Sequence, residues 1–527
     1  MKRVLISDNL AKEGIDILNA FEGLEVDVNT GLKPEELKEI IGNYDGLVIR
    51  SATKVTAEIL EAAKNLKVVG RAGIGVDNVD VPAATNKGVI VMNTPGGNTT
   101  TTAEHALSLM MSLVRNIPQA TASMKEGKWE KKKFQGHEMC GKTLGVIGLG
   151  AIGSIVADRA LGLKMKVLAY DPFITPERAA ELGVEKASLE ELFAGADIIT
   201  IHVPKLKETT DLINAATIAT MKDGVYIVCA ARGGIVNEGD LLAGLESGKV
   251  AGAALDVFSE EPPGLTPLVS HPNLICTPHL GASTEEAQTA VAIQVAEQIG
   301  NYLLKGVIVN SINVPSVSPE ALEQMGPFLH LAEKLGALQA QLGLEAIRAV
   351  EIEYSGKAAE GRTPLLTAAA LSGLLKHAAG EWVNIVNAPV TAKERGIDVR
   401  ETVSSKGGDY TSLIRLNVVA DKGGRPLAGA VFGKNEPRVV EIDGIDIEAT
   451  PEGNMLILWN NDRPGLVGAI GTTLGERGIN IGQLQFGRSA PGGDAITVIN
   501  VDSEPDDATL EALGALDNVN NLHKVYL

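Results

Sequence analysis

The first 95 residues alternate between two hydrophobic patterns. Short apolar runs, which predict buried strands, lie at residues 3–7, 24–28, 46–51, 66–72 and 89–94. Between these runs, apolar positions recur every three or four residues, the spacing of amphipathic helices, at residues 11–21, 34–44 and 57–65. Strands that alternate with helices predict a parallel sheet covered by helices.

A second series with the same rhythm follows a long predicted helix at residues 102–117. Its apolar runs lie at residues 142–149, 166–171, 196–203, 225–231, 250–257 and 274–279. A further helix is predicted at residues 283–304, and the chain leaves this module near Pro315. The sequence therefore predicts a second parallel α/β unit.

The remaining chain divides into two parts. Residues 316–450 are rich in alanine and glycine and carry no catalytic pattern that we can interpret. From Met455 the pattern predicts a compact strand–helix–strand–strand–helix–strand unit, with its elements at residues 455–460, 465–478, 479–488, 495–502, 507–516 and 521–527.

Composition narrows the class of protein. A chain of 527 residues is too long for one core, and roughly three or four domains are expected. The net charge of −19 argues against a nucleic-acid partner or an anionic membrane surface. It also means that an anionic substrate needs a local basic pocket.

The cysteines and the first residues bear on the compartment. Cys140, Cys229 and Cys276 form no CxxC pair, so we expect neither a disulfide framework nor a metal site. The apolar run in "MKRVLISDNL" is too short for a signal peptide, and no run has membrane-spanning length. The sequence predicts a cytoplasmic enzyme.

A glycine-rich turn in "LGVIGLGAIGSIVADRA" is the first chemical motif. Gly148, Gly150 and Gly153 have GxGxxG spacing, with an apolar strand before them and a helix after them. Asp171 ends the next predicted strand, 18 residues after Gly153 (171 − 153). The alternative is a tight turn without a ligand, but the strand, the helix and the acidic residue together favour dinucleotide binding.

The same segment indicates which dinucleotide is bound. Asp171 can accept hydrogen bonds from ribose hydroxyls, and it repels a 2′-phosphate. Pro172 and Phe173 follow it, where an NADP site often has an arginine. We therefore predict NAD as the cofactor.

Three polar residues follow predicted strands of the second unit. Arg232, Glu261 and His279 each lie at or just beyond the carboxyl end of a parallel strand, where such sheets bind ligands. His279 is predicted to exchange the hydroxyl proton, Glu261 to orient and charge its imidazole, and Arg232 to bind an α-carboxylate. The alternatives are a surface arginine, a loop carboxylate and a capping histidine. Glu260 competes with Glu261 by adjacency.

Several blocks resemble a known family. "GLGAIG", "ARGGIVNE", "ALDVFSEEPP" and "TPHLGAST" resemble the signature blocks of the D-isomer-specific 2-hydroxyacid dehydrogenases. "VIRSATKVT", "VVGRAGIGVDNVD", "NTPGGNTTTTAEHA" and "WEKKKFQG" extend the resemblance to the long, ACT-containing D-3-phosphoglycerate dehydrogenases. The resemblance covers nearly the whole chain and is weakest between about 316 and 450.

The resemblance implies a set of site residues. The family's catalytic Arg, Glu and His correspond to Arg232, Glu261 and His279, because its Glu directly precedes "PP". The implied NAD contacts are Gly148, Gly150, Ala151, Ile152, Gly153, Asp171, Val203, Ala230, Ala231, Arg232, Asp256, His279, Leu280, Gly281 and Ala282. Ile74 replaces a polar residue of some relatives, which leaves that cofactor contact to the backbone.

The resemblance also implies an architecture. A Rossmann NAD-binding domain (98–283) is inserted into a discontinuous, flavodoxin-like substrate domain (1–97 and 284–315). An α+β intervening domain (316–450) and a C-terminal, ferredoxin-like ACT domain (453–527) follow.

A phosphorylated substrate needs cations, because a phosphate adds about two negative charges at neutral pH. Arg50 and Arg71 each end a predicted strand of the first unit, and "WEKKKF" supplies a lysine run whose alternative role is a solvated loop. The predicted substrate contacts are Arg50, Ser51, Arg71, Gly73, Gly75, Asn98, Lys131, Lys132 and Lys133. The expected activity is oxidation of 3-phosphoglycerate to 3-phosphohydroxypyruvate, the first step of serine synthesis, by a homo-oligomer, in the family a tetramer.

Two alternative functions remain open. One is another D-2-hydroxyacid dehydrogenase that acts on glycerate, lactate or phosphite. The other, from a different class, is an NAD-sensing co-repressor that uses this fold to bind partners. The ACT-like tail and the basic residues argue against the first alternative. The ACT-like tail, and the lack of a basic surface suited to chromatin, argue against the second.

The resemblance further implies an effector site for L-serine between paired ACT domains. Asn460 and Asp462 correspond to the loop after the first ACT strand, and Asn480 to the entry of the second strand. Asp462 is expected to accept from the ammonium group, and Asn480 to donate to the carboxylate. The alternative is a polar turn that caps a helix.

Overall fold

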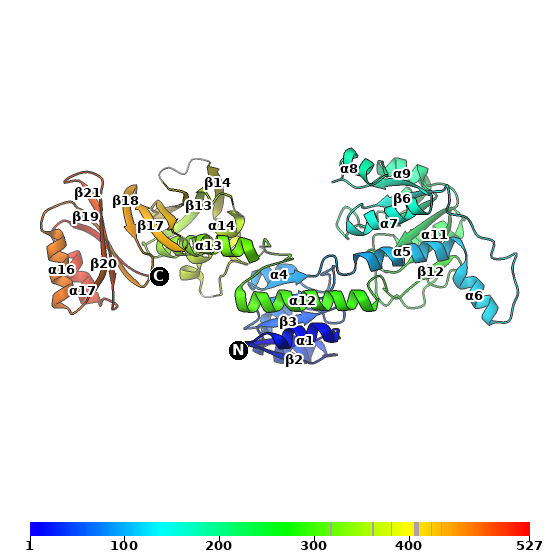
Figure 1. Cartoon of the computed structure of the whole chain (residues 1–527), viewed down its shortest axis with the longest axis horizontal. Coiled ribbons are helices and arrows are strands. Elements are labelled where there is room, and N and C mark those ends of the chain that lie inside the picture. The colour runs from blue at the N-terminus through cyan, green and yellow to red at the C-terminus, as the bar shows by residue number, and fades with distance from the viewer. Residues whose placement is uncertain (317–318, 361–362, 381, 405–409, 423, 434) are drawn as a thin grey trace.

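The computed structural model describes residues 1–316, 319–360, 363–380, 382–404, 410–422, 424–433 and 435–527. The described chain folds into four bodies that follow one another along an elongated molecule (Figure 1). Two parallel α/β bodies form one half, and two mixed bodies, ending in the C-terminus, form the other half.

The first body is built on a parallel sheet with the strand order β2-β1-β3-β4-β5. Its strands are β1 (Lys2–Ile6), β2 (Leu24–Val28), β3 (Gly46–Ile49), β4 (Val68–Arg71) and β5 (Ile90–Asn93). Its helices are α1 (Lys12–Ala20), α2 (Pro34–Ile40), α3 (Ala57–Ala62), α4 (Val81–Asn86) and the returning α12 (Glu285–Lys305), with a 3-10 turn η1 (Ile41–Asn43). α12 packs against α1 so closely that a side chain at Gly14 would collide with Ala292. Glycine at position 14 permits this close approach.

The second body has a parallel sheet with the strand order β12-β11-β10-β9-β6-β7-β8. All strands point the same way, and the chain builds the sheet outward in one direction from β6 and then in the other direction from β9. Its strands are β6 (Thr143–Ile147), β7 (Lys166–Tyr170), β8 (Glu185–Lys186), β9 (Ile198–Ile201), β10 (Val225–Cys229), β11 (Val250–Leu255) and β12 (Leu274–Cys276). Its helices are α5 (Thr99–Val114), α6 (Ile117–Lys125), α7 (Ala151–Gly162), α8 (Pro176–Glu181), α9 (Leu189–Gly195), α10 (Ala215–Thr220) and α11 (Glu238–Glu246). The chain enters this body through α5 and leaves it just before α12 (Figure 1).

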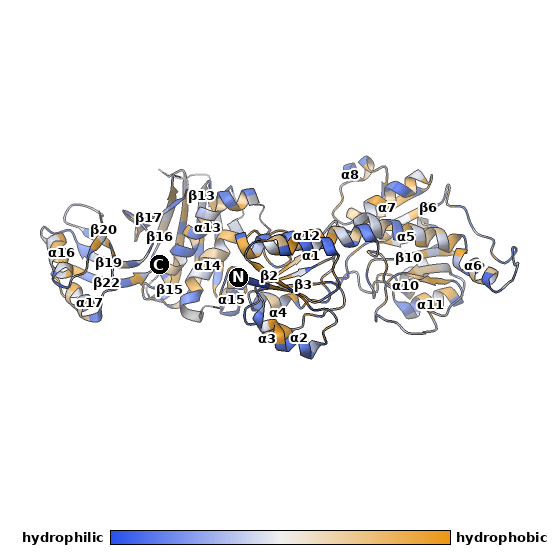
Figure 2. Cartoon of the chain, turned by 60° about the horizontal axis from the view of Figure 1, so that its bottom comes forward, coloured by the Kyte–Doolittle hydropathy of each residue, from blue (hydrophilic) through white to orange (hydrophobic). Residues whose placement is uncertain are grey.

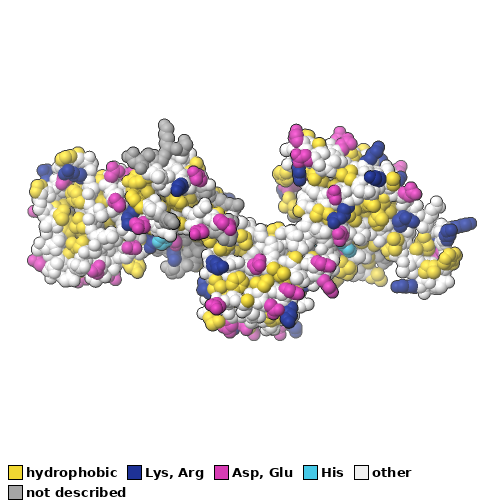
Figure 3. All heavy atoms as spheres, in the orientation of Figure 1, with side chains coloured by type: hydrophobic (Ala, Val, Ile, Leu, Met, Phe, Trp, Pro, Cys, Tyr) yellow, Lys and Arg dark blue, Asp and Glu magenta, His cyan; other side chains and the backbone are white. Residues whose placement is uncertain are grey.

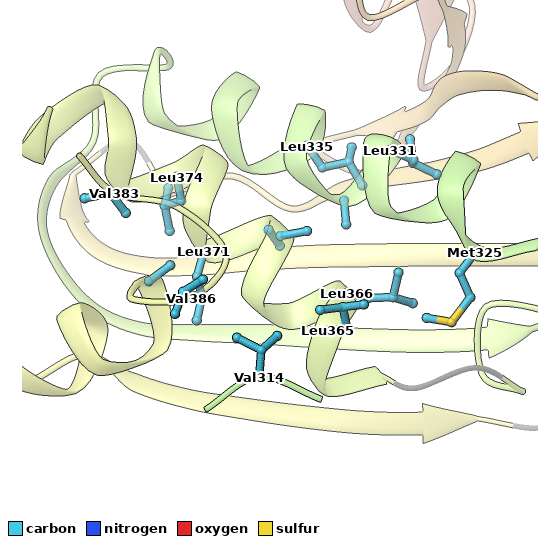
Figure 4. Close-up of a cluster of buried hydrophobic side chains, with 14 of the residues drawn as sticks. Val314, Met325, Leu331, Leu335, Leu365, Leu366, Leu371, Leu374, Val383 and Val386 are labelled. Carbon is cyan, nitrogen blue, oxygen red and sulfur yellow. The ribbon is translucent and has the colours of Figure 1, made fainter. Parts of the chain in front are cut away.

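The third body combines a sheet of order β14-β13-β15-β16-β17-β18 with helices. β14 runs parallel to β13, and the other neighbours are antiparallel. The elements are α13 (Pro319–Ala340), β13 (Glu345–Gly356), α14 (Thr363–Ala379), α15 (Ala388–Glu394), β14 (Asp398–Ser404), β15 (Ser412–Lys422), β16 (Leu427–Phe432), β17 (Glu436–Ile442) and β18 (Ile445–Ala449). Aliphatic side chains of α13 and α14 interlock, and Val314 from the preceding linker joins them (Figure 4).

The last body is an antiparallel sheet of order β20-β21-β19-β22, covered by two helices. Its elements follow as β19 (Asn454–Asn461), α16 (Leu466–Glu476), β20 (Ile481–Arg488), β21 (Asp494–Val501), α17 (Asp507–Gly514) and β22 (Val519–Tyr526). This is the ferredoxin-like order predicted for an ACT unit.

The predicted fold class is confirmed: a Rossmann body is inserted into a flavodoxin-like body, and an α+β body and a ferredoxin-like body follow. Central strands of the two parallel sheets are mostly hydrophobic, while the helices carry both hydrophobic and hydrophilic residues (Figure 2). Within the described residues, no helix combines the length and the apolar character needed to cross a membrane.

Candidate active site

A cavity of about 270 Å³ lies where the first two bodies face each other. The first body contributes Arg71 and the loop after β4, and the start of α5 adds Asn98. The second body contributes the ends of β9 and β10 and the turn that follows β12. All these segments lie at carboxyl ends of parallel strands or at the bridging helix, which is where open α/β sheets bind ligands.

Arg232 follows β10 and faces the first body across this cavity. Its Nε donates to Oδ2 of Asp77 at 2.9 Å, and its Nη1 donates to the Ala231 carbonyl at 2.7 Å. Nη2 lies over Gly75, where a β-carbon would approach it to 1.9 Å. An anion in the cavity can therefore accept from Nη2 while Asp77 fixes the other edge of the guanidinium.

Arg71 is a second cation in the same cavity, packed over Gly73 of the same loop. A β-carbon at Gly73 would lie 1.8 Å from Nη1 of Arg71. Burial, and then repulsion by Arg232, lower the pKa of Arg71 to about 10, so it still carries its charge at neutral pH. Its Nε is buried and has no hydrogen-bond partner among the described residues. A buried, under-satisfied guanidinium is a strong recognition group for an anion.

His279 and Glu261 form a hydrogen-bonded pair at the edge of this cavity. His279 Nδ1 lies 2.8 Å from Glu261 Oε2, and the other carboxylate oxygen accepts from the Phe258 N–H at 3.1 Å. The carboxylate that bonds to His279 in the described structure is that of Glu261 and not that of Glu260, as the position before "PP" implied. His279 has a φ of 54°, a left-handed conformation that is uncommon for a non-glycine residue and concentrates at functional sites.

Asp256, a predicted NAD contact, is buried behind the lining of this cavity. Its carboxylate has no exposed surface and is absent from the lining of the cavity, because it points back into the second body. Its oxygens accept from the backbone N–H groups of Leu280 and Gly281 at 2.7 and 2.8 Å, and from the Thr277 hydroxyl at 2.5 Å. Asp256 therefore organises the turn that carries His279.

The glycine-rich turn has the geometry that a pyrophosphate requires. Gly148 has a φ of 90°, and a β-carbon there would lie 2.6 Å from the His202 carbonyl oxygen. A β-carbon at Gly153 would lie 1.9 Å from the Gly148 oxygen, whereas the space beside Gly150 is open. Gly150 is also the N-cap of α7, whose first N–H groups are available to an anion.

Asp171 stands at the end of β7 beside this turn. Its Oδ2 accepts from the Leu149 N–H and its Oδ1 from the Phe173 N–H, both at 2.9 Å. Each carboxylate oxygen keeps a second lone pair for a ribose hydroxyl. The arrangement fits NAD, because a 2′-phosphate would meet this carboxylate.

The cavity fits a dinucleotide on two further observations. Asn98 is 8% exposed, lines the cavity, and its Oδ1 has no partner within the described structure. Ile152, Val203 and Pro204 supply an apolar wall on the side of the second body. The other predicted cofactor positions in the cavity lining are Ala230, Ala231, Arg232, His279, Gly281 and Ala282.

Several predicted substrate residues lie away from this cavity. Arg50 donates to the Asn9 carbonyl and, like Ser51, is absent from the lining. Lys131, Lys132 and Lys133 lie in an exposed turn after α6, where Lys133 is 3.8 Å from Glu130. Figure 3 shows Lys and Arg side chains that project at this end of the molecule. Within one chain, these lysines do not line the cavity, and their contact with substrate stays a prediction.

The three predicted effector residues have different hydrogen-bond partners in the structure. Asn460 is 1% exposed, and its Oδ1 accepts from the Thr497 hydroxyl, because strand alternation turns this position inward. Asp462 accepts from Arg488 and from the Gly492 N–H at 2.8 and 2.9 Å. Those two bonds outweigh a slight effect of burial and lower its pKa. Asn480 donates to Asp502 at 2.7 Å.

The sequence reasoning missed three polar residues near the cavity. Asp77 lies in the quoted block "GIGVDNVD", but its pairing with Arg232 spans 155 positions of sequence. His202 follows β9 and lines the cavity, and burial lowers its pKa to about 4, so it is neutral. His105, on α5, contacts Asp256. For His202, its position after a parallel strand was the available signal.

Comparison with known proteins gives concordant results along the chain. Residues 107–281 match the model of the NAD-binding domain of D-isomer-specific 2-hydroxyacid dehydrogenases. Residues 324–443 match the D-3-phosphoglycerate dehydrogenase intervening domain, and residues 454–518 match the ACT domain.

Full-length relatives carry one name. The chain is 46% identical to a D-3-phosphoglycerate dehydrogenase of Archaeoglobus fulgidus over 98% of both chains. It is 45% identical to the enzyme of that name from Synechocystis over all of this chain and 95% of the relative. Among solved structures, D-lactate dehydrogenase of Aquifex aeolicus, complexed with NAD and lactic acid, covers 59% of this chain and 100% of its own, with 28% identity and a TM-score of 0.53.

Proposed function

The chain belongs to the D-3-phosphoglycerate dehydrogenase family of NAD-dependent oxidoreductases, and we propose that its cavity oxidises 3-phospho-D-glycerate to 3-phosphohydroxypyruvate. The observation that carries the proposal is the full-length identity above 40%, intervening body included. Two arginines in one cavity of an otherwise acidic chain support a substrate with two anionic groups. The reaction is the first step of the phosphorylated route to L-serine.

In this mechanism four side chains at the cavity act on the substrate or on one another. Nη2 of Arg232 binds the α-carboxylate, and Arg71 binds the phosphate. His279 takes the proton of the C2 hydroxyl as that carbon gives up its hydride, and returns the proton in the reverse direction. Glu261 holds the imidazole by its Nδ1, which leaves Nε2 for the substrate.

The cofactor supplies the hydride acceptor, and this chain's residues hold it. Gly148, Gly150 and the first turn of α7 bind the pyrophosphate, and Asp171 accepts from the adenosine ribose. The apolar wall excludes water from the reacting carbon, and the free Oδ1 of Asn98 is an acceptor within the same cavity.

A substrate panel tests the proposal. Purified protein is assayed in the easier direction, with NADH and 3-phosphohydroxypyruvate, beside pyruvate, hydroxypyruvate and glyoxylate. We expect kcat/KM for the phosphorylated acid to exceed that for each other acid by at least tenfold. Faster turnover of an unphosphorylated acid would assign the chain to another 2-hydroxyacid activity, and no turnover of any acid would favour the binding-protein alternative.

Regulation by L-serine is the second part of the proposal, with the enzyme acting in the cytoplasm as a homotetramer. Asp462 is the proposed acceptor for the ammonium group and Asn480 the proposed donor to the carboxylate, while the buried Asn460 is left out. The ACT match supports a ligand-binding role for this body. Calorimetry with L-serine on the wild type and on Asp462→Ala tests the site, and equal binding by both proteins would refute it. Sedimentation velocity tests the oligomer.

A further inference from the structure

A buried hydrogen-bond network lies directly behind the turn that carries His279. At its centre is the carboxylate of Asp256, which has no exposed surface. His105, a residue of α5, brings its Nε2 to 3.1 Å from Asp256 Oδ1 and 3.1 Å from Thr277 Oγ1. The His105 side chain is 18% exposed, and the mechanism above gives it no task.

The charges decide which atom donates in this network. Burial alone would raise the pKa of Asp256, but hydrogen bonds from His105, Thr277 and the Leu280 N–H together lower it, so the group is a carboxylate. The Thr277 hydroxyl donates its hydrogen to this carboxylate, with an oxygen–oxygen distance of 2.5 Å. Nε2 of His105 must therefore carry a hydrogen, which it donates to Asp256 and shares with the Thr277 oxygen.

The other contacts of Asp256 reach the turn that carries His279. Its carboxylate accepts from the N–H groups of Leu280 and Gly281, and its own carbonyl accepts from the His279 N–H at 3.0 Å. The left-handed φ of His279 is an uncommon conformation that persists only where surrounding contacts enforce it. The bonds to Asp256 are such contacts.

The network also joins the two segments through which the chain crosses between the first two bodies. His105 lies on α5, the first crossing, and Leu280 and Gly281 begin the second crossing, which leads to α12. Thr101 and Thr284, one on each crossing, place their hydroxyl oxygens 3.3 Å apart. One carboxylate is thus bonded to both crossings immediately behind the proposed acid–base group.

We propose that His105 is a positioning residue for the reaction: by donating to Asp256 it holds the turn at residues 278–281, and with it the His279 imidazole, in line with Glu261. This inference rests on the proposed function, because it needs His279 to be the acid–base group. Its chemical requirement is a neutral or charged N–H donor at the place of Nε2. The task is geometric, and errors of about 1 Å in such a placement can lower rates by roughly a hundredfold.

Two variants of His105 separate the donor from mere packing. His105→Leu keeps an apolar body on α5 and removes the donor, whereas His105→Gln places an amide N–H at a similar distance from the backbone. Ser108→Ala, on the same helix, is the matched control, because within the described part of the chain its hydroxyl bonds to the Glu104 carbonyl of its own helix. For each protein, kcat and KM are measured with NADH and the 2-keto acid that the wild type reduces best. NADH affinity is measured by fluorescence, and exchange of the Leu280 and Gly281 amides by hydrogen–deuterium exchange.

We expect His105→Leu to lower kcat by roughly ten- to a hundredfold, with KM and NADH affinity within about threefold of the wild type. The Leu280 and Gly281 amides should exchange faster, His105→Gln should regain most of the lost kcat, and Ser108→Ala should behave as the wild type. An unchanged kcat in His105→Leu overturns the inference, and so does an equal loss in the Leu and Gln variants. Failure of the wild type to prefer the phosphorylated acid would refute the substrate assignment alone, since the His105 comparison uses whichever acid is reduced.

Discussion

At the scale of single residues, the cavity concentrates positive charge in a chain with a net charge of −19. Arg71 and Arg232 repel each other, and Asp77 offsets only part of this repulsion, because its side chain is 71% exposed to solvent. Desolvation of Arg71 without a partner for its Nε costs stability in the ligand-free protein. An anionic substrate would offset this repulsion and accept hydrogen bonds from the arginines, so relief of both costs adds to the free energy of substrate binding.

The first prediction concerns Arg71. Replacement by methionine should raise KM for 3-phosphohydroxypyruvate by roughly ten- to a hundredfold, the usual effect of losing a hydrogen bond between charged groups. The same change should raise the Tm of the ligand-free protein, because it removes a desolvated charge that Arg232 repels. Steady-state kinetics and calorimetric melting measure the two effects. Arg50→Met is the matched control, since Arg50 does not line the cavity, and an equal rise in KM for that variant would contradict the assignment.

The second prediction concerns the histidine–glutamate pair. His279→Ala should lower kcat by roughly two to four orders of magnitude, the range for loss of a general acid–base group, while NADH still binds. Glu261→Gln should also lower kcat and alter its pH dependence, because an amide does not stabilise a charged imidazole as a carboxylate does. Its neighbour provides the control: Glu260→Gln should leave turnover unchanged. Near-normal turnover of His279→Ala would remove His279 from the chemistry.

The third prediction follows from the lowered pKa of Asp256. Its ordinary value is 3.8, and the folded protein holds it lower, so the carboxylate stabilises the fold above that pH. The contribution is lost as the pH falls through the folded-state pKa. The Tm difference between the wild type and Asp256→Asn should therefore be constant from pH 5 to 8 and shrink below about pH 4. A difference that grows on acidification would contradict this sign.

At the scale of elements, the strands that the sequence predicts best are the most deeply buried ones. The central strands of the parallel sheets are mostly buried on both faces, so apolar runs identify β1, β6 or β10 directly from the sequence. β8 was missed because it consists of two exposed charged residues, Glu185 and Lys186.

The strands of the third body were also missed from the sequence, because they are not uniformly buried. β13 and β15 are long antiparallel strands with one face only partly covered, and their alternation is interrupted where the pairing register shifts. The residues of the site also fall into those that the sequence could indicate and those that it could not. Sequence placed Arg232, Glu261 and His279 at one sheet edge, whereas the partners Asp77 and His105 depend on how two bodies and a helix meet.

The fourth prediction concerns the helix that begins at the glycine turn. Gly153→Ala should abolish NADH binding or lower its affinity strongly, since the added methyl would lie 1.9 Å from a backbone oxygen of the turn. Gly162→Ala, in the same helix, meets no atom within 4 Å and should stabilise the protein by up to about 1 kcal/mol. Fluorescence titration with NADH and thermal melting compare the two, and normal affinity in Gly153→Ala would contradict the assigned turn.

At the scale of the whole molecule, the cores are divided unequally. One continuous cluster of buried side chains runs from the first body through the third into the ACT body, whereas the NAD-binding body has separate clusters. We therefore expect the NAD-binding body to move relative to the other three bodies, and the cavity lies at that boundary. We propose that a signal from the ACT body reaches the cavity by shifting the first body, with which it shares this cluster.

The last prediction tests this route at the junction of the third and first bodies. Asn384 donates to the Gly88 carbonyl at 3.0 Å, and its Oδ1 accepts from the Val386 N–H at 2.8 Å. Asn384→Asp keeps that acceptor and loses the donor. A neutral hydrogen bond contributes about 1 kcal/mol, so inhibition by L-serine should weaken about fivefold. The Kd for L-serine and kcat without it should stay within about twofold. Asn65→Asp removes a comparable bond to the Gly42 carbonyl inside the first body and should leave inhibition unchanged. Unaltered inhibition in Asn384→Asp, with L-serine bound, would mean that coupling bypasses this junction.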